Sequence, residues 1–199
     1  MPDFATYYRD LAEWEGKPVV DLIAPWNFGD MEAISNDFEQ AFRHEEFCAA
    51  PLLIEAGISN QSIGNKVANH FAGNINKRLH AFRVIDCVGA GYPDKVLMSV
   101  GDQRPFAFEL KATSGFDAKD SNRIVLTSSS QKLRQRFRPP IFHLLGTVCY
   151  VLIGTEINIE TLRLDFLEPT SSVNVRLEAS VSQRILASAQ HRNVCINAA

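Results

Sequence analysis

Asp94, Glu109 and Lys111 are the residues of this chain whose types and spacing best suit a chemical site. They lie in a stretch that predicts two strands, residues 94–100 and 105–113, joined by the polar turn GDQR. Because side chains alternate between the two faces of a strand, Glu109 and Lys111 share a face. Two carboxylates beside an ammonium group form a set that can bind a divalent cation and orient a water molecule.

The pairing of the two strands determines whether these side chains meet. We expect Val100 to face Pro105. In that register Asp94 lies opposite Lys111, with Glu109 beside them on the same face. Two carboxylates about 5 Å apart repel by roughly 3 kcal/mol unless a cation lies between them, and Mg²⁺ suits such a site. A slip of one residue would move Asp94 to the other face.

Pro93-Asp94 and the later triplet Glu109-Leu110-Lys111 resemble the PD…(D/E)xK signature of a nuclease superfamily that includes most type II restriction endonucleases. The resemblance implies that Asp94 and Glu109 hold Mg²⁺ while Lys111 orients the attacking water. It also implies a restriction-endonuclease-like fold and hydrolysis that leaves 5′-phosphate ends. Mn²⁺ would substitute for Mg²⁺, and Ca²⁺ would bind without efficient cutting. The alternative is an amphipathic hairpin in which Glu109 and Lys111 form an ordinary solvated pair.

Length and composition are those of one ordinary globular domain: 199 residues, of which 46% are hydrophobic and 22% charged. We expect a single nuclease domain over residues 1–199, with a mainly helical part in 1–80, a catalytic sheet core in 81–170 and a C-terminal helix in 171–199. The order of the elements predicts an α/β fold with a mixed central sheet flanked by helices. Neither a secretion signal nor a membrane-spanning run is evident, so we expect a cytoplasmic protein that does not contact a membrane.

The local pattern of apolar residues and breakers predicts the individual elements. In particular, Asp30 is expected to cap the second helix. The sequence predicts helices over residues 3–15, 30–47, 61–79, 131–138 and 175–189, and strands over residues 81–88, 94–100, 105–113, 124–127, 146–154 and 161–167.

Polar and basic residues in three segments are candidates for DNA contact. Helix 61–79 carries asparagines beside a basic row, the segment after Lys111 is a polar loop, and helix 131–138 holds the densest positive cluster. Amide side chains suit adenine edges, and cations suit phosphates. Each helix could instead present a plain solvated face. The candidates are Asn65, Asn69, Lys119, Asn122, Arg123, Ser129, Ser130, Gln131, Lys132, Arg134 and Arg136.

The formal net charge of −3 argues against indiscriminate binding to nucleic acid, although one basic cleft could be masked in the total. We therefore expect a sequence-specific endonuclease on double-stranded DNA, acting as a homodimer whose two-fold symmetry matches a palindrome. A separate methyltransferase would protect the host DNA. Two alternatives remain open: a repair or junction nuclease with the same site, and a non-catalytic DNA-binding module. Glu55 is the nearest upstream carboxylate that could join the site.

Overall fold

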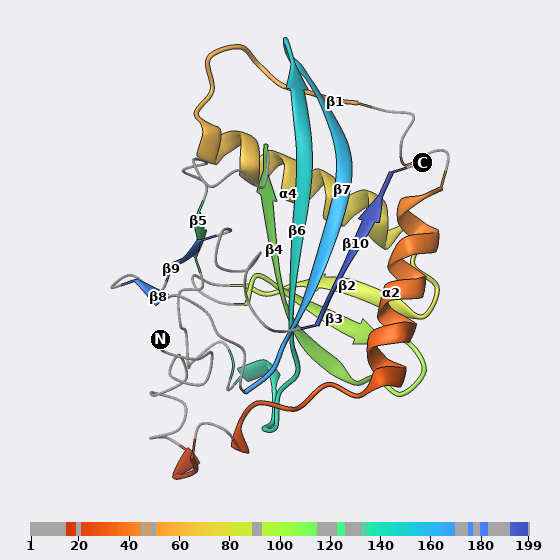
Figure 1. The fold of residues 1–199 in the computed structure, drawn as a ribbon, viewed down its shortest axis with the longest axis vertical. Coiled ribbons are helices and arrows are strands. Elements are labelled where there is room, and N and C mark those ends of the chain that lie inside the picture. Colours follow the sequence, from red (N-terminus) through yellow and green to blue (C-terminus); the bar gives the residue numbers. More distant parts are fainter. Residues whose placement is uncertain are drawn as a thin grey trace.

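A mixed β-sheet with two helices packed on one of its faces forms the body of the protein (Figure 1). The computed structural model describes residues 15–18, 21–44, 47, 51–88, 93–114, 123–125, 133, 135–169, 175–176, 180–182 and 192–198. The helices are α2 (Phe28–Phe42) and α4 (Asn60–Asn76), and the strands are β1 (Leu52–Leu53), β2 (Phe82–Asp86), β3 (Lys95–Ser99), β4 (Pro105–Thr113), β5 (Arg123–Val125), β6 (His143–Ile153), β7 (Glu156–Leu167), β8 (Val175–Arg176), β9 (Ser180–Ser182) and β10 (Asn193–Asn197).

Seven strands make up the main sheet, in the order β1-β7-β6-β4-β3-β2, with β10 also paired to β7. Only the pairing of β4 with β6 is parallel, and the other pairs in this sheet are antiparallel. A second, three-stranded sheet has the order β5-β9-β8. The expected α/β class with a mixed sheet is therefore confirmed, and both described helices pack on the same face. Neither described helix is long and apolar enough to cross a membrane.

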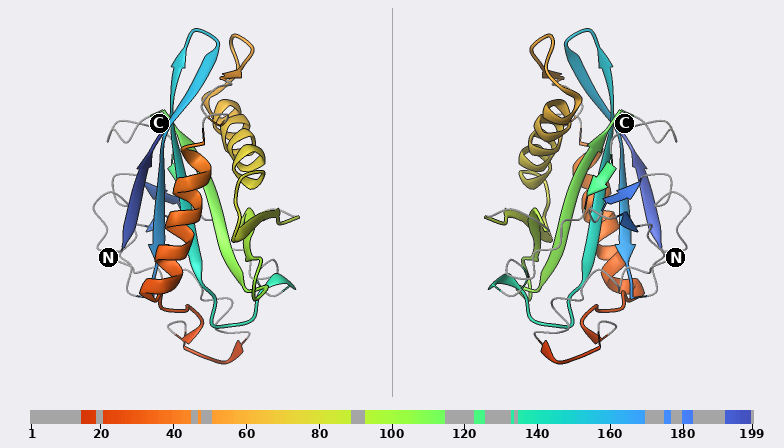
Figure 2. Two further views of the ribbon diagram at one scale, coloured as in Figure 1. Left: turned by 90° about the vertical axis from the view of Figure 1, so that its right-hand side faces the viewer. Right: turned by 90° about the vertical axis from the view of Figure 1, so that its left-hand side faces the viewer.

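Helix α4 covers the apolar face of β4, on one side of the sheet (Figure 2). Its buried residues recur at helical spacing, as predicted, and they share a core with the large side chains of β4. Phe38 of α2 meets Phe108 of β4 on this same face, with ring centroids 5.9 Å apart. The residues that alternate with Phe108 along β4, Glu109 and Lys111 among them, therefore point to the opposite face.

Gly146 allows β6 to lie close beneath the side chains of β4. A Cβ atom at this position would lie 2.9 Å from Cε2 of Phe108 and 3.1 Å from Cδ1 of Leu110. Because both side chains are buried, we expect Gly146→Ala to lower the free energy of unfolding by about 1–3 kcal/mol, which urea denaturation would measure. Gly73→Ala is the matched control. Gly73 lies within α4, and a Cβ atom at this position would meet nothing within 4 Å. Equal stability of the two variants would contradict the prediction.

Two predictions about individual elements are wrong. The first residue of α2 is Phe28, and its N-cap is Asn27, whose side chain accepts a hydrogen bond from the backbone of Asp30. The C-terminal helix predicted over 175–189 is absent where the structure describes that region, which contains strands β8 and β9. Apolar residues in VNVRL alternate with polar ones, and this period of two fits a strand better than a helix.

Candidate active site

The hairpin of β3 and β4 has a register that differs by two residues from the predicted one. Met98, not Val100, lies opposite Pro105. The backbone N–H of Val100 donates to the carbonyl of Ala81 at 2.8 Å, which draws this residue toward β2 and out of the β3–β4 pairing. The turn is correspondingly longer, and Gln103 adopts a left-handed conformation with φ of 57°. A shift of two residues preserves the faces, so the predicted convergence of side chains survives the error in register.

Asp94, Glu109 and Lys111 lie together on the face of the sheet that α4 does not cover. The Lys111 ammonium contacts Oε1 of Glu109 and lies 3.5 Å from Oδ2 of Asp94. The other oxygen of Glu109, Oε2, accepts a hydrogen bond from the backbone N–H of Asp94 at 2.9 Å. Both carboxylates thus surround one cationic group, which is the arrangement that the motif predicts.

Exposure increases from Glu109 toward Asp94. The side chain of Glu109 is 2% exposed, that of Lys111 is 26% exposed and that of Asp94 is 45% exposed. Solvent or a substrate therefore approaches this group of residues from the side of Asp94. Glu109, at the inner end, has neighbouring β-strands on both sides and is held in the low-dielectric interior.

Burial raises the pKa of Glu109 to about 7, because an ionised carboxylate loses its hydration inside the protein. The charge of Lys111 opposes this shift, and the charge of Asp94 adds to it. Burial by itself would lower the pKa of Lys111, but the two carboxylates outweigh it and raise that pKa. Near neutral pH, Lys111 is therefore a stable cation, whereas Glu109 is close to its point of half-ionisation.

This titration predicts how stability depends on pH. The pKa of Glu109 is higher in the folded protein than its ordinary value of 4.5, so the folded state binds this proton more tightly than the unfolded state. The stabilisation from the protonated carboxyl is complete below pH 4.5 and is lost as the pH rises toward 7. We expect the free energy of unfolding of the wild type to fall across this range relative to Glu109→Gln, as measured by urea denaturation without divalent metal. Parallel pH profiles for the two proteins would contradict this.

A buried polar layer extends from these residues across the next two strands. Apart from Asp37, every buried polar or charged residue in the described part of the chain lies on this face of β4, β6 or β7. One row of paired positions runs from Lys111 through Thr147 to Arg163, and Asp165 lies two residues beyond Arg163. Sequence reasoning missed this layer. The sequence does contain an indication of this layer. In the apolar strand LRLDFL, two opposite charges occupy alternate positions, with the same spacing as Glu109 and Lys111.

Arg163 and Asp165 form a buried ion pair within that layer. The Arg163 Nε atom donates to Asp165 at 3.0 Å and Nη2 donates at 2.7 Å, a two-point contact that holds both side chains in place. Asp165 is fully buried. The buried polar layer thus contains an ion pair whose two charges neutralise each other.

The remaining predicted residues do not lie with the triad where the structure describes them. Asn65 and Asn69 are exposed on α4, which covers the opposite face of the sheet. Glu55 is exposed beyond β1, and two strands separate β1 from β4. Arg136 is exposed, and only the backbone of Arg123 is described. The predicted contacts Lys119, Asn122, Ser129, Ser130, Gln131, Lys132 and Arg134 lie outside the described residues.

The donor set of the site suits a hard divalent cation. Within the described residues, no three His, Cys, Asp or Glu side chains come close enough to enclose a metal. Asp94 and Glu109 nevertheless turn oxygens toward the same ammonium group, so these two carboxylates would hold a divalent cation, with the partly exposed Asp94 on the side toward solvent. Mg²⁺ commonly binds in this way, through one or two carboxylates with water and substrate oxygens as its other ligands.

Comparisons with known proteins yield one structural similarity. No protein-family model matches this chain. No curated protein matches it in sequence either. Among solved structures, the chain is similar to the crystal structure of the restriction endonuclease BglI bound to its DNA recognition sequence, with 12% sequence identity and a TM-score of 0.39 over 97% of this chain and 88% of that one. At these values the similarity carries no argument about the chemistry of this chain.

Proposed function

We propose that this protein is a Mg²⁺-dependent endonuclease that hydrolyses phosphodiester bonds in double-stranded DNA and leaves 5′-phosphate ends. The observation that supports this proposal is the convergence of Asp94, Glu109 and Lys111 on one face of a hairpin, with the lysine in contact with both acids. An ordinary surface ion pair does not require a glutamate that is 2% exposed, because burial of that carboxylate is costly.

Each residue of the triad has a distinct part in the proposed reaction. Asp94 and Glu109 would hold the metal, which when bound supplies a water molecule of lowered pKa and polarises the phosphate. Lys111 would orient that water through its ammonium group and stabilise the negative charge that develops on the phosphate oxygens. The bond from the water oxygen to phosphorus would form, with the proton of that water passing to solvent, while the bond from phosphorus to the 3′ oxygen breaks. The 3′ oxygen then takes up a proton from water.

The proposal extends to the biological form of the enzyme. Cleavage of both strands at a palindrome takes two catalytic events, and a homodimer would provide two equivalent catalytic sites through its two-fold axis. Such an enzyme would work beside a separate DNA methyltransferase that protects the same sequence. The basic segment with Arg134 and Arg136 would contact the DNA backbone, because arginine is well suited to phosphate.

Digestion of a fully sequenced plasmid tests this function. Purified protein with Mg²⁺ is expected to produce discrete, reproducible fragments, and sequencing of their ends should show 5′-phosphates at one sequence. Replacement of Mg²⁺ by Ca²⁺ should preserve DNA binding and nearly abolish cutting. Nicks at branched or damaged DNA alone would favour a repair or junction nuclease. Binding of duplex DNA with no cleavage of any substrate would contradict the enzymatic proposal.

A further inference from the structure

The segment from Ala56 to Ile85 has a charge composition unlike that of the rest of the chain. It contains no Asp or Glu, although the chain as a whole has 23 such residues and a net charge of −3. Four cationic residues lie within it, together with asparagine at five positions from residue 60 to residue 76. This acid-free segment contains the whole of α4 and β2 up to Ile85, so the structure determines which of its side chains reach the surface.

Helix α4 places these polar side chains on the outside of the molecule. Its apolar stripe packs against β4, and the other side of the helix faces away from the sheet (Figure 2). We define the α4 surface by the six polar residues of this outward side, the last of which is the helix C-cap. They are Asn65, Lys66, Asn69, His70, Asn74 and Lys77.

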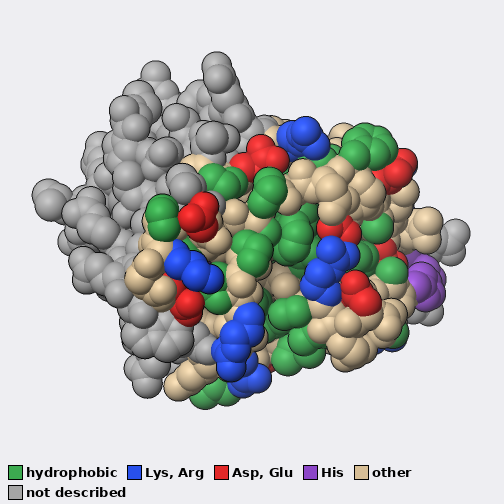
Figure 3. Space-filling model, turned by 90° about the horizontal axis from the view of Figure 1, so that it is seen from below, with side chains coloured by type: hydrophobic (Ala, Val, Ile, Leu, Met, Phe, Trp, Pro, Cys, Tyr) green, Lys and Arg blue, Asp and Glu red, His purple; other side chains and the backbone are tan. Residues whose placement is uncertain are grey.

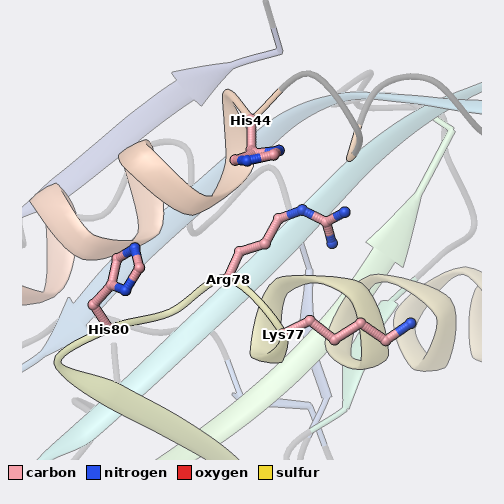
Figure 4. Close-up of a pocket in the computed structure, with 4 residues that line it drawn as sticks. All are labelled: His44, Lys77, Arg78 and His80. Carbon is pink, nitrogen blue, oxygen red and sulfur yellow. The ribbon is translucent and has the colours of Figure 1, made fainter.

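A basic cavity lies at the C-terminal end of this surface. It has a volume of about 300 Å³ and is lined by His44, Lys77, Arg78 and His80, which come from the ends of both helices and the segment before β2 (Figure 4). In the view of Figure 4, the Arg78 side chain lies between His44 and Lys77. The C-terminus of α4 helps to hold Arg78 in position, because Nη1 of Arg78 donates to the carbonyl of Asn74 at 3.1 Å.

Two carboxylates of α2, the helix that precedes His44, have partners of their own. Asp37 accepts the backbone N–H groups of three successive residues, beginning with His80 at 2.9 Å, and so anchors the start of β2. Glu39 forms an ion pair with Arg43 at 2.9 Å. Glu45 and Glu46 follow His44 in the sequence and lie outside the described residues.

Several described cations elsewhere in the molecule are paired with acids. Lys95 is paired with Asp86, and Arg104 is paired with both Asp30 and Asp102. The face of the molecule in Figure 3 accordingly shows basic and acidic side chains next to one another. The α4 surface differs from that face because it combines amides and cations with no acidic residue of its own.

We propose that the α4 surface and its basic cavity bind phosphate groups of a nucleic-acid backbone, as a second contact on the side of the sheet opposite the triad. Lysine, histidine and amide side chains are the groups that proteins use for backbone phosphates, and a carboxylate among them would repel the ligand. Helix α4 has 17 residues and is therefore about 25 Å long, which corresponds to about seven base pairs of duplex DNA.

The experiment compares two double variants that remove the same charge. Lys66→Gln/Lys77→Gln alters the α4 surface, and Lys17→Gln/Arg192→Gln removes two exposed cations elsewhere as the matched control. Binding of a fluorescent 12-base-pair duplex is measured by anisotropy at several KCl concentrations, without divalent metal. We expect the slope of log K against log[KCl] to become less steep by about two in the α4 variant only. An unchanged slope, or equal changes in both variants, would overturn the proposal.

The readout separates this inference from the proposed nuclease activity. The titration contains no metal, so the proposed cleavage does not take place during the measurement. A variant of the triad, Lys111→Gln, is titrated under the same conditions. If the wild type never cuts DNA but the α4 variant has a less steep slope, the proposal for the α4 surface is supported and the proposed nuclease activity is contradicted. If the wild type cuts DNA while the α4 variant binds the duplex as the wild type does, the nuclease activity is supported and the proposal for the α4 surface is contradicted.

A second measurement distinguishes a nucleic-acid backbone from free phosphate as the source of the ligand. The backbone amide signals of His44, Arg78 and His80 are followed by NMR during addition of the 12-base-pair duplex or of inorganic phosphate. We expect the duplex to shift these signals at micromolar concentration and inorganic phosphate to require far more. Shifts caused by inorganic phosphate alone would replace the backbone proposal with a site for a small anion. If neither ligand shifts these signals, the cavity does not bind phosphate and this part of the proposal is wrong.

Discussion

Lys111→Met is expected to lower the rate of DNA cleavage by about 10³-fold while the fold and most DNA binding are retained. The ammonium group lies against both carboxylates, where it can orient a water molecule and stabilise charge on the phosphate as the bond to the water forms. Methionine keeps much of the length of the side chain and removes the charge. Single-turnover cleavage of a labelled duplex containing the recognition sequence measures the chemical step directly.

Lys95→Met is the matched control for this prediction. Lys95 lies in β3 of the same hairpin, on the other face of the sheet, and is paired with Asp86. Its replacement should change the cleavage rate only slightly. If both variants lost activity equally, damage to the hairpin would explain the loss; if Lys111→Met kept the wild-type rate, this lysine would have no part in the chemistry.

The same substitution should increase metal affinity even though it slows cleavage. In the wild type the ammonium of Lys111 is drawn to the two carboxylates that would bind the metal, so a divalent cation is repelled by it. Because the charge of Lys111 lowers the pKa of Glu109, its removal also makes this carboxyl harder to ionise. The calcium affinities of the two proteins should therefore be compared at about pH 8.5, which favours the ionised form of Glu109. Calorimetric titration with Ca²⁺ at this pH should show tighter binding by Lys111→Met than by the wild type.

Glu109→Gln is expected to reduce both metal affinity and cleavage, the latter by about 10³-fold. Glutamine keeps the shape of the protonated glutamic acid but cannot supply a negative charge to the metal. The variant should fold normally, because the amide resembles the form of Glu109 that burial favours. Calcium titration by calorimetry and single-turnover cleavage with Mg²⁺ would measure the two losses separately.

Asp86→Asn provides the comparison for Glu109→Gln. This aspartate ends β2 and its side chain is 79% exposed, so loss of its charge should leave calcium affinity close to that of the wild type. Calcium binding by Glu109→Gln as tight as that of the wild type would show that Glu109 is not a metal ligand. The resemblance to a metal-dependent nuclease would then have no support in this residue.

Local spacing in the sequence was sufficient for the features that depend on neighbouring residues. The alternation of FAFELKAT placed Glu109 and Lys111 on one face of β4, opposite to Phe108, because successive side chains of any strand point in opposite directions. The apolar stripe of residues 61–79 likewise indicated which side of α4 would be buried, because helical periodicity is a property of the chain itself.

Only the tertiary structure determined the features that depend on distant partners. The β3–β4 register shifted because Ala81 takes the N–H of Val100, and nothing in the hairpin sequence indicates that contact. The raised pKa of Glu109 and the burial of the Arg163–Asp165 pair arise because β6 lies between β4 and β7 in the sheet. Side-chain periodicity is encoded over a few residues, whereas strand pairing and burial arise from contacts between segments tens of residues apart.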